Sequence, residues 1–375
     1  MALILKLASR NLFQDRLRFI ATIIGIVFSI VLVTVQLGLF LGFQKMVTTM
    51  IDHAPADLWI VSQGTKCFED PSMLDKHDQT KALSVPGVSD ATPLLIGFTE
   101  WSVPNNGSTP VFVVGTSPQG LQPWHVVQGK LSDLSDSHAV AVDQSYFGRL
   151  GVNALGDTTK IRGHEVRVKV ITKGIRSFTT TPYVFAPMDS AQTYIGTQRN
   201  DISYVLVRLA HGANANAVRD ALVKKLDKVE VLTTDEFRNR SRSFWLFGTG
   251  AGFALFGGAL LGAIVGTVII AQTLYSSTKD HLTEFATLRA IGSSSFYIHK
   301  VIITQALLSA VIGFSVAFLI DYVVLRLTMD SALPIVITPV LTIGLFFLTV
   351  VMCVVSAITA IVQVTRIDPA RVFRQ

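Results

Sequence analysis

Charged residues are scarce in this chain of 375 residues, where Asp, Glu, Lys and Arg make up 15% and hydrophobic residues 50%. With a mean hydropathy of +0.48, the composition is too apolar for an ordinary soluble protein and indicates a membrane protein. The net charge is +6, but Lys and Arg form no stripe with interleaved aromatics, so we predict no nucleic-acid partner. Of the two cysteines, Cys67 and Cys353, the second lies deep in an apolar run, which argues against a disulfide between them.

The motifs of several enzyme classes are also missing. No GxxxxGK loop followed by Ser or Thr is present, so the chain should not bind ATP in that way. HExxH, paired CxxC and GxSxG motifs are absent as well, and the six histidines between residues 44 and 242 have no ligand spacing. We therefore predict no catalytic residue, no metal site and no cofactor in this chain.

Four long apolar runs remain, each able to cross a bilayer as a helix of about 20 residues. The predicted fold is a membrane protein with four transmembrane α-helices and a large α+β extracytoplasmic domain between helices 1 and 2. In order, the chain divides into an amphipathic cytoplasmic helix (1–18), a first span (19–43), the α+β domain (44–242), a second span (243–274), a cytoplasmic loop (275–300), a third span (301–327), a short external turn (328–334), a fourth span (335–364) and a cytoplasmic tail (365–375). The first span is too long for a cleaved signal peptide, so we expect it to be retained.

The distribution of basic residues predicts the orientation. The N-terminus, the loop at 275–300 and the C-terminal tail are short and basic, which places them in the cytoplasm. Arg238, Arg240 and Arg242 run against this rule just before the second span. We interpret them as part of a helical stalk that rises from the membrane.

The inserted domain has the pattern of a mixed α+β fold. Its apolar runs are short and typical of strands, at 58–61, 111–114, 139–142, 166–171 and 204–209. Asn105, Asn106 and Gly107 form a turn signal. Residues 213–226 predict a helix, with Asn214 or Asn216 as its cap.

Small residues and a single acid mark the spans. Gly258, Gly262 and Gly266 form a GxxxGxxxG ladder, which lets helix backbones approach closely in lipid. This ladder is either a packing face within the chain or a dimer seam. The spans are otherwise nearly free of charge, with Asp321 as the exception, which argues against an ion-driven pump or a polar pore.

The polar stretch at 275–300 predicts a short amphipathic helix at the cytoplasmic surface. Thr278, Leu282, Phe285 and Leu288 fall on one helical stripe, and Gly292 with the serines after it ends the helix. Its apolar face either lies in lipid or fits a groove of a cytoplasmic partner. With a large external domain and no ion path, such a chain is suited to passing movement across a membrane.

Five stretches together resemble the FtsX-like permeases of the MacB-type (type VII) ABC transporters. The main one is KDHLTEFATLRAIGSSSFYIHKVIITQALL, where Glu284, Leu288, Arg289 and Gly292 match the family's acidic residue, Leu-Arg-Ala stretch and Gly before the third span. The others are LASRNLFQDRLRF, LGVNALGDTTKIRGHEVRVKVI, VFAPMDSAQTYIG and RIDPARV. The combination is most similar to the DevC-like branch, in which the ATPase is a separate chain.

The resemblance implies a permease subunit that is not itself an enzyme. Its partners would be an ABC ATPase subunit carrying ATP and Mg, a second permease chain as a homodimer, a periplasmic membrane-fusion adaptor with an outer-membrane duct, and membrane lipid. The location implied is the bacterial inner membrane, and the cargo a lipid, glycolipid, peptide or drug-like molecule for export. Six residues would form the ATPase-coupling helix: Leu282, Glu284, Phe285, Leu288, Arg289 and Gly292.

Other outputs of the same architecture stay open. The chain could serve lipoprotein release with a periplasmic carrier, regulate a periplasmic hydrolase, or sense an external signal. The partner found beside it would separate these functions: an adaptor favours export, a hydrolase activator favours regulation, and a kinase favours sensing.

Overall fold

The computed structural model describes residues 2–104, 107–281, 284, 287, 292–328 and 335–365. The chain forms two compact units: unit 1 comprises Met1–Gly42 and Phe253–Gln375, and unit 2 comprises Phe43–Gly252. The helices are α1 (Ala2–Gln14), α2 (Arg16–His53), α3 (His77–Leu83), α4 (Phe147–Leu150), α5 (Met188–Ile195), α6 (Ala215–Lys225), α7 (Thr234–Ser243), α8 (Ala251–Asp280), α10 (Ser295–Thr328) and α11 (Pro339–Thr365). The strands are β1 (Leu58–Ser62), β2 (Leu74–Asp75), β3 (Val88–Val103), β4 (Gly107–Thr116), β5 (Val126–Gln128), β6 (Ala139–Asp143), β7 (Thr158–Ile161), β8 (His164–Thr172), β9 (Tyr183–Pro187), β10 (Asp201–Ile202), β11 (Tyr204–Leu209) and β12 (Val229–Thr233).

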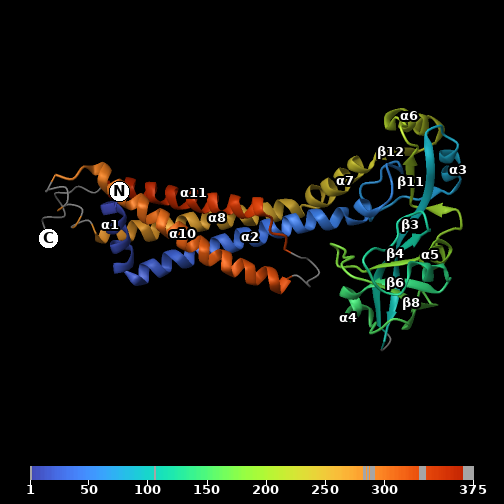
Figure 1. The fold of residues 1–375 in the computed structure, drawn as a ribbon, viewed down its shortest axis with the longest axis horizontal. Helices are drawn as coiled ribbons and strands as arrows, with labels where there is room; N and C mark the ends of the chain where they lie inside the picture. Colours follow the sequence, from blue (N-terminus) through green and yellow to red (C-terminus); the bar gives the residue numbers. More distant parts are fainter. Residues whose placement is uncertain are drawn as a thin grey trace. The chain divides into compact units, whose positions relative to one another are not determined.

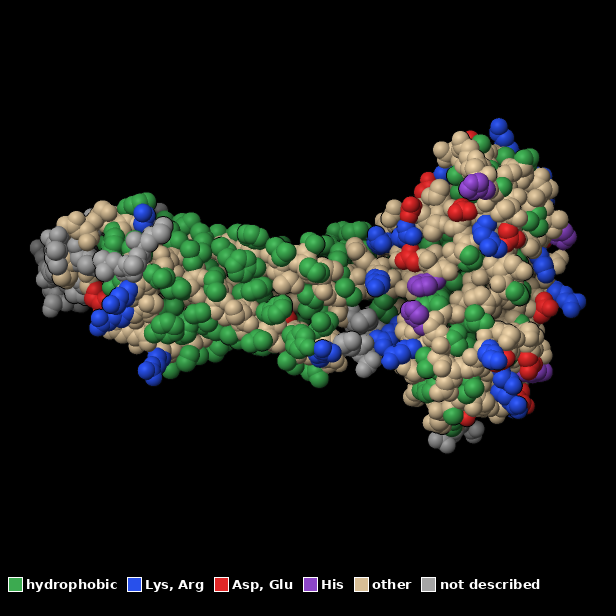
Figure 2. Space-filling model, in the orientation of Figure 1, with side chains coloured by type: hydrophobic (Ala, Val, Ile, Leu, Met, Phe, Trp, Pro, Cys, Tyr) green, Lys and Arg blue, Asp and Glu red, His purple; other side chains and the backbone are tan. Residues whose placement is uncertain are grey.

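Unit 1 is a bundle of long apolar helices (Figure 1). Among the described residues, α2, α8, α10 and α11 are long and apolar enough to cross a membrane, which confirms the four predicted spans. The view in Figure 2 shows hydrophobic side chains over most of this unit, with Lys and Arg toward its ends. The buried centre of the bundle includes Ile26, Ile30, Ala306 and Ala310.

The first two spans do not end where the sequence predicted. Helix α2 continues to His53, past the expected domain border at 43–44, because Met46, Val47 and Met50 form a buried face that packs within unit 2. The second span was expected from residue 243, but Phe244–Gly248 is a π-helix and α8 starts only at Ala251. Gly250, with a φ of +80°, separates the two, a conformation that glycine tolerates best.

The ends of the polar loop also differ from the prediction. Helix α8 runs on to Asp280 and α10 begins at Ser295, so both ends of the stretch at 275–300 belong to transmembrane helices rather than to one short helix. The fourth span starts at Pro339 instead of residue 335, with proline in the first turn, where its missing N–H is harmless. Residues 329–334, most of the predicted external turn, lie outside the described residues.

Unit 2 is built on a ten-stranded sheet in the order β12-β1-β11-β3-β4-β9-β6-β8-β5. The long strand β3 joins its two halves: residues 88–94 pair with β11, and residues 95–103 pair with β4. Strand β7 pairs with both β3 and β8. Strands β3, β4, β9, β6, β8 and β7 are therefore paired in a closed cycle, which leaves the short strand β5 as an edge of this half of the sheet.

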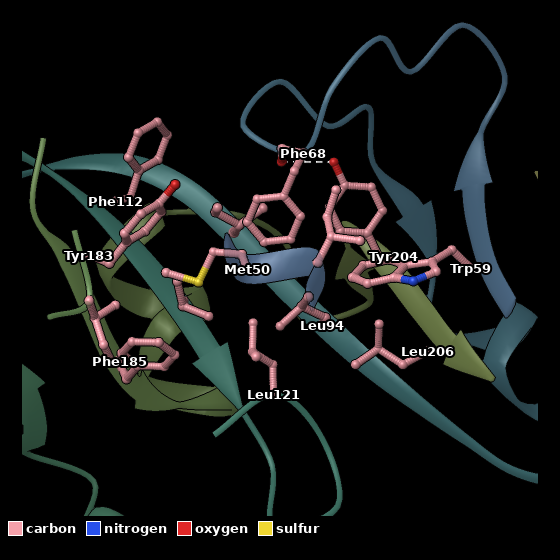
Figure 3. Close-up of a cluster of buried hydrophobic side chains, with 14 of the residues drawn as sticks. Met50, Trp59, Phe68, Leu94, Phe112, Leu121, Tyr183, Phe185, Tyr204 and Leu206 are labelled. Carbon is pink, nitrogen blue, oxygen red and sulfur yellow. Dashed lines mark hydrogen bonds between the residues drawn. The ribbon is translucent and has the colours of Figure 1, made fainter. Parts of the chain in front are cut away.

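Both faces of the paired strands are buried. Along β4, Val111 and Val113 join one hydrophobic cluster, while Phe112 and Val114 join another on the opposite face. Figure 3 shows the second cluster, in which Met50 from the end of α2 lies among side chains of the sheet. Unit 2 is thus a folded α+β domain whose core includes the last turns of α2, from Met46 to Ile51.

The local predictions for unit 2 hold well. All five predicted strand runs are strands, and the predicted helix at 213–226 is α6, capped by Asn214 through the backbone N–H groups of Asn216 and Ala217. Strands β3 and β4 flank the predicted turn, of which Asn105 and Asn106 lie outside the described residues. The segment with Arg238, Arg240 and Arg242 is helical, as expected for a stalk, and belongs to α7.

Candidate functional site

The stretch between α8 and α10 is the candidate coupling site, and its described ends are well defined. Gly292 has a φ of +103°, in the left-handed region that favours glycine, so the backbone changes direction there. Two residues later, the Ser294 hydroxyl accepts a hydrogen bond from the backbone N–H of Tyr297 at 3.3 Å and thereby caps α10. The chain thus enters the third transmembrane helix through a glycine turn and a serine cap.

Arg18 connects this stretch to the beginning of the chain. At the start of α2, its guanidinium forms ion pairs with Asp15 and Asp280 and donates to the carbonyl of Ser276 at 3.2 Å. The last turn of α8 is thereby joined to the bend between α1 and α2. Because these charges are partly exposed, each pair contributes at most about 1 kcal/mol, so the connection orients the helix ends more than it stabilises them.

The structure describes two of the six predicted coupling residues. Glu284 is exposed, and its carboxylate lies 3.1 Å from the His281 ring. Gly292 forms the turn described above. The other four, Leu282, Phe285, Leu288 and Arg289, lie outside the described residues, so their common stripe stays a prediction.

The three glycines of the ladder face α2 of the same chain. A side chain at Gly258 would meet Gln36, one at Gly262 would meet Leu32 and Val33, and one at Gly266 would meet Ser29 and Met352. Close approach of α8 to α2 therefore requires these small residues. This is the intrachain packing that was one of the two alternatives.

The sequence analysis did not single out a polar site in unit 2, at the segment before α8. The Glu69 carboxylate accepts hydrogen bonds from Trp245 Nε1 at 2.9 Å and from the Tyr183 hydroxyl at 3.2 Å. Burial raises the pKa of the Glu69 carboxyl to about 7, although both hydrogen bonds oppose this shift. Trp245 lies in the π-helix, a local irregularity that often marks a functional position.

No single signal in the sequence pointed to the hydrogen-bonded pair of Glu69 and Trp245. Glu69 lies in a loop between β1 and β2, and Trp245 falls within the predicted second span at 243–274, near whose end an aromatic residue is ordinary. Among the described residues, no group of three or more His, Cys, Asp or Glu side chains could hold a metal ion.

The fold and these sites define a class of protein: a multi-pass membrane protein with four apolar helices and a large α+β domain inserted after the first. Two family models match in the same order: the MacB-like periplasmic core domain over residues 19–225 and the FtsX-like permease C-terminal domain over residues 251–369. The chain belongs to this family and is an ABC transporter permease of the MacB/FtsX type.

Known relatives agree with this assignment. The chain is 26% identical over 385 aligned residues to an uncharacterized ABC transporter permease of Mycobacterium tuberculosis, in the strains CDC 1551 and H37Rv, with 98% of both chains covered. Among solved structures, it resembles the periplasmic region of MacB from Actinobacillus actinomycetemcomitans (15% identity, TM-score 0.39, 50% of this chain and 94% of that one). It also resembles the extracellular domain of the ABC-type transporter YknZ from Gram-positive bacteria (14% identity, TM-score 0.36, 48% and 99%).

Proposed function

We propose that the chain is the mechanotransmission subunit of an export ABC transporter, which couples ATP hydrolysis by a separate ATPase to movement of unit 2. The observation that carries the proposal is the match of the MacB-like and FtsX-like models to successive parts of a chain without a phosphate-binding loop. We infer that a separate ATPase subunit supplies the energy. A cytoplasmic ATPase would reach the chain at its short basic segments, of which the stretch between α8 and α10 is the longest inside the chain.

The covalent path from this stretch to unit 2 supports the mechanism. Helix α8 runs without interruption from Asp280 back to Ala251, and the π-helix and α7 precede it in unit 2, with Thr249 and Gly250 between the π-helix and α8. A rigid helix transmits displacement along its axis, and the π-helix offers a place where that displacement can turn into rotation. The Glu69–Trp245 hydrogen bond ties the π-helix to the core of unit 2, so movement of α8 would be passed to the domain.

The remaining assignments follow from the family and from charge. We place the protein in the bacterial inner membrane with both termini in the cytoplasm, because the short basic segments favour that side. Two permease chains would pair with two ATPase subunits, and an external adaptor, with an outer-membrane duct in a Gram-negative envelope, would accept a lipid, glycolipid, peptide or drug-like cargo.

Affinity purification of the tagged chain from native membranes tests these partners. Retention of an ATPase and an adaptor is expected; an ATPase with a periplasmic carrier or hydrolase activator would change the output, and no ATPase would overturn the proposal.

A pair of substitutions tests the coupling role itself. We expect Leu288→Asp to abolish ATPase retention and transport, because it places a charge on the predicted apolar stripe, while insertion into the membrane is unchanged. Thr287→Asp adds the same charge one residue away, at an exposed position, and should retain the ATPase. Equal retention by the two variants would show that the stripe does not dock in an ATPase groove.

A further inference from the structure

A cavity of about 400 Å³ lies within unit 1, between α2, α10 and the start of α11. Its walls are largely apolar, with Phe314, Phe318, Leu325, Ile343 and Leu345 among the lining residues. Phe318 and Ile343 are also exposed on the bundle surface, so the cavity is open toward the side that would face lipid. Its volume falls within the range of small-molecule sites, about 300–1,000 Å³.

Among the described residues that line this apolar cavity, one is acidic. Asp321 is only 6% exposed, and its Oδ2 accepts a hydrogen bond from the Thr34 hydroxyl of α2 at 2.9 Å. Its Oδ1 is buried and has no hydrogen-bond partner among the described residues. A carboxylate left with an unpaired oxygen in apolar surroundings is unfavourable, and acids at membrane depth usually serve a ligand or a proton.

The other polar groups of the cavity are hydroxyls that can accept hydrogen bonds. The Thr342 hydroxyl donates to the carbonyl of Thr338 at 3.2 Å, and the Tyr322 hydroxyl accepts from the Arg326 guanidinium at 2.7 Å. The Thr34 hydroxyl lies 2.7 Å from the carbonyl oxygen of Ile30 and 2.9 Å from Asp321 Oδ2, and these two acceptors share its one proton. The Thr34 and Thr342 hydroxyls both line the cavity, and their oxygens therefore retain lone pairs that can accept hydrogen bonds.

From this arrangement we propose that the cavity binds an amphiphile with a protonated primary amine, its ammonium group at Asp321 and its hydrocarbon chain along the Phe and Leu walls. An ammonium carries three N–H donors and one positive charge, which match a single carboxylate surrounded by acceptor hydroxyls. A metal ion would need several oxygen ligands, most of them charged, and Asp321 is the only acid among the described residues that line the cavity. The site is independent of the transport proposal, because it requires binding only.

Photo-crosslinking to the full chain in phosphatidylcholine nanodiscs tests the proposal. The probes are octadecylamine and octadecanol, each with a diazirine on its chain, so that they differ only in the head group. We expect the wild type to be labelled on residues 314–325 and 337–345, and to prefer the amine about 10- to 100-fold, as for a hydrogen bond to a charged group.

Two variants decide the role of the carboxylate. Asp321→Asn keeps the shape and removes the charge, so it should lose the preference for the amine while octadecanol labelling stays unchanged. Ser315→Ala, at an exposed position of α10 where the hydroxyl bonds its own helix, should behave like the wild type. Equal labelling of the wild type by both probes would overturn the proposal, because this is the result expected for a carboxyl that holds only a proton. Labelling at other residues, or a preference for the amine that persists in Asp321→Asn, would overturn it as well.

Discussion

The two units bury different kinds of side chain. In unit 2 the largest buried residues are aromatic, including Trp59, Trp101 and Tyr204. In unit 1 the helices meet at small residues such as Gly266 and Ala310. Unit 2 folds by removing large apolar surfaces from water, whereas helices in lipid gain little from apolar burial and associate through close packing. Unit 2 should therefore be most sensitive to loss of volume, and unit 1 to gain of volume.

Polar groups show the same contrast. In unit 1 most buried hydroxyls bond within their own helix, as Thr278 does to the carbonyl of Leu274 and Thr349 to that of Leu345. In unit 2 they connect distant segments, as Tyr204 does to the carbonyl of Phe68 and Ser203 to that of Ile96. Polar contacts thus help to specify the fold of unit 2, whereas in unit 1 fewer of them join one helix to another, as Thr34 does to Asp321 and Ser356 to the carbonyl of Thr267.

The largest effect is expected from truncating the aromatic core. Trp59 is fully buried, with ring contacts to Phe68, Tyr204 and Phe237. Trp59→Ala should lower the free energy of unfolding of unit 2 by about 3–5 kcal/mol, because it leaves a cavity and removes buried area. Pulse proteolysis of the full chain in urea and detergent would measure this loss.

The matched control is Phe98→Ala in the same domain. Phe98 is 57% exposed, and its ring lies tilted against Phe112, so its loss should change stability by about 0.5–1 kcal/mol. Similar losses for Trp59→Ala and Phe98→Ala would contradict the view that buried aromatic volume holds unit 2 together.

The second largest effect is expected from pH, which should change the stability of unit 2. The pKa of Glu69 is about 7 when folded against an ordinary value of 4.5, so between these two values the folded state binds more protons than the unfolded state. The contribution of Glu69 to stability should therefore be fully present below about pH 4.5 and fall as pH rises to 7, by up to about 3 kcal/mol. Glu69→Gln should remove this part of the pH profile.

The measurement is the difference in stability between wild type and Glu69→Gln as a function of pH. This difference is needed because other carboxyls change the stability with pH in the opposite direction. The pKa values of Asp90 and Glu230 are lowered, chiefly by hydrogen bonds from Arg208 and Arg240, so their contributions are lost toward acid pH in both proteins. Trp245→Phe removes one hydrogen bond to Glu69 and serves as a second probe. A difference between wild type and Glu69→Gln that does not change between pH 4.5 and 7 would argue against a proton on Glu69.

The third effect tests unit 1 by adding volume. Gly266→Leu would place a side chain against Ser29 of α2 and Met352 of α11, and overpacking of this kind destabilises by about 1–3 kcal/mol. Gly257→Leu lies on the same helix where a side chain would meet nothing within 4 Å, and should be nearly neutral. The fraction of folded protein that remains on heating in detergent, measured for both variants, distinguishes Gly266→Leu from Gly257→Leu. A larger loss for Gly257→Leu would place the important helix contact on the other face of α8.

The contrast between the units also explains what the sequence could predict. The four spans, the five strand runs and α6 were recovered, because hydrophobic runs and alternation are local signals. The helix ends were not: α2 reaches His53 because its last turns pack in unit 2, a tertiary contact that leaves little trace in composition. The cavity at Asp321 depends on α2 and α11 meeting α10, so the sequence marked the acid but not its surroundings.

The smallest effect is expected at the surface connection between the start of α2 and the end of α8. Arg18→Ala removes the ion pairs to Asp15 and Asp280 and should change stability by no more than about 1 kcal/mol, since exposed pairs are weak. Hydrogen exchange should nevertheless increase at the last turn of α8, because the guanidinium also caps the carbonyl of Ser276. Arg16→Ala, beside it, should leave that exchange unchanged. Arg18→Ala could also reduce the ATPase activity of the assembled complex while the bundle stays intact. That result would show that the Arg18 contacts orient the end of α8 for coupling rather than stabilise it.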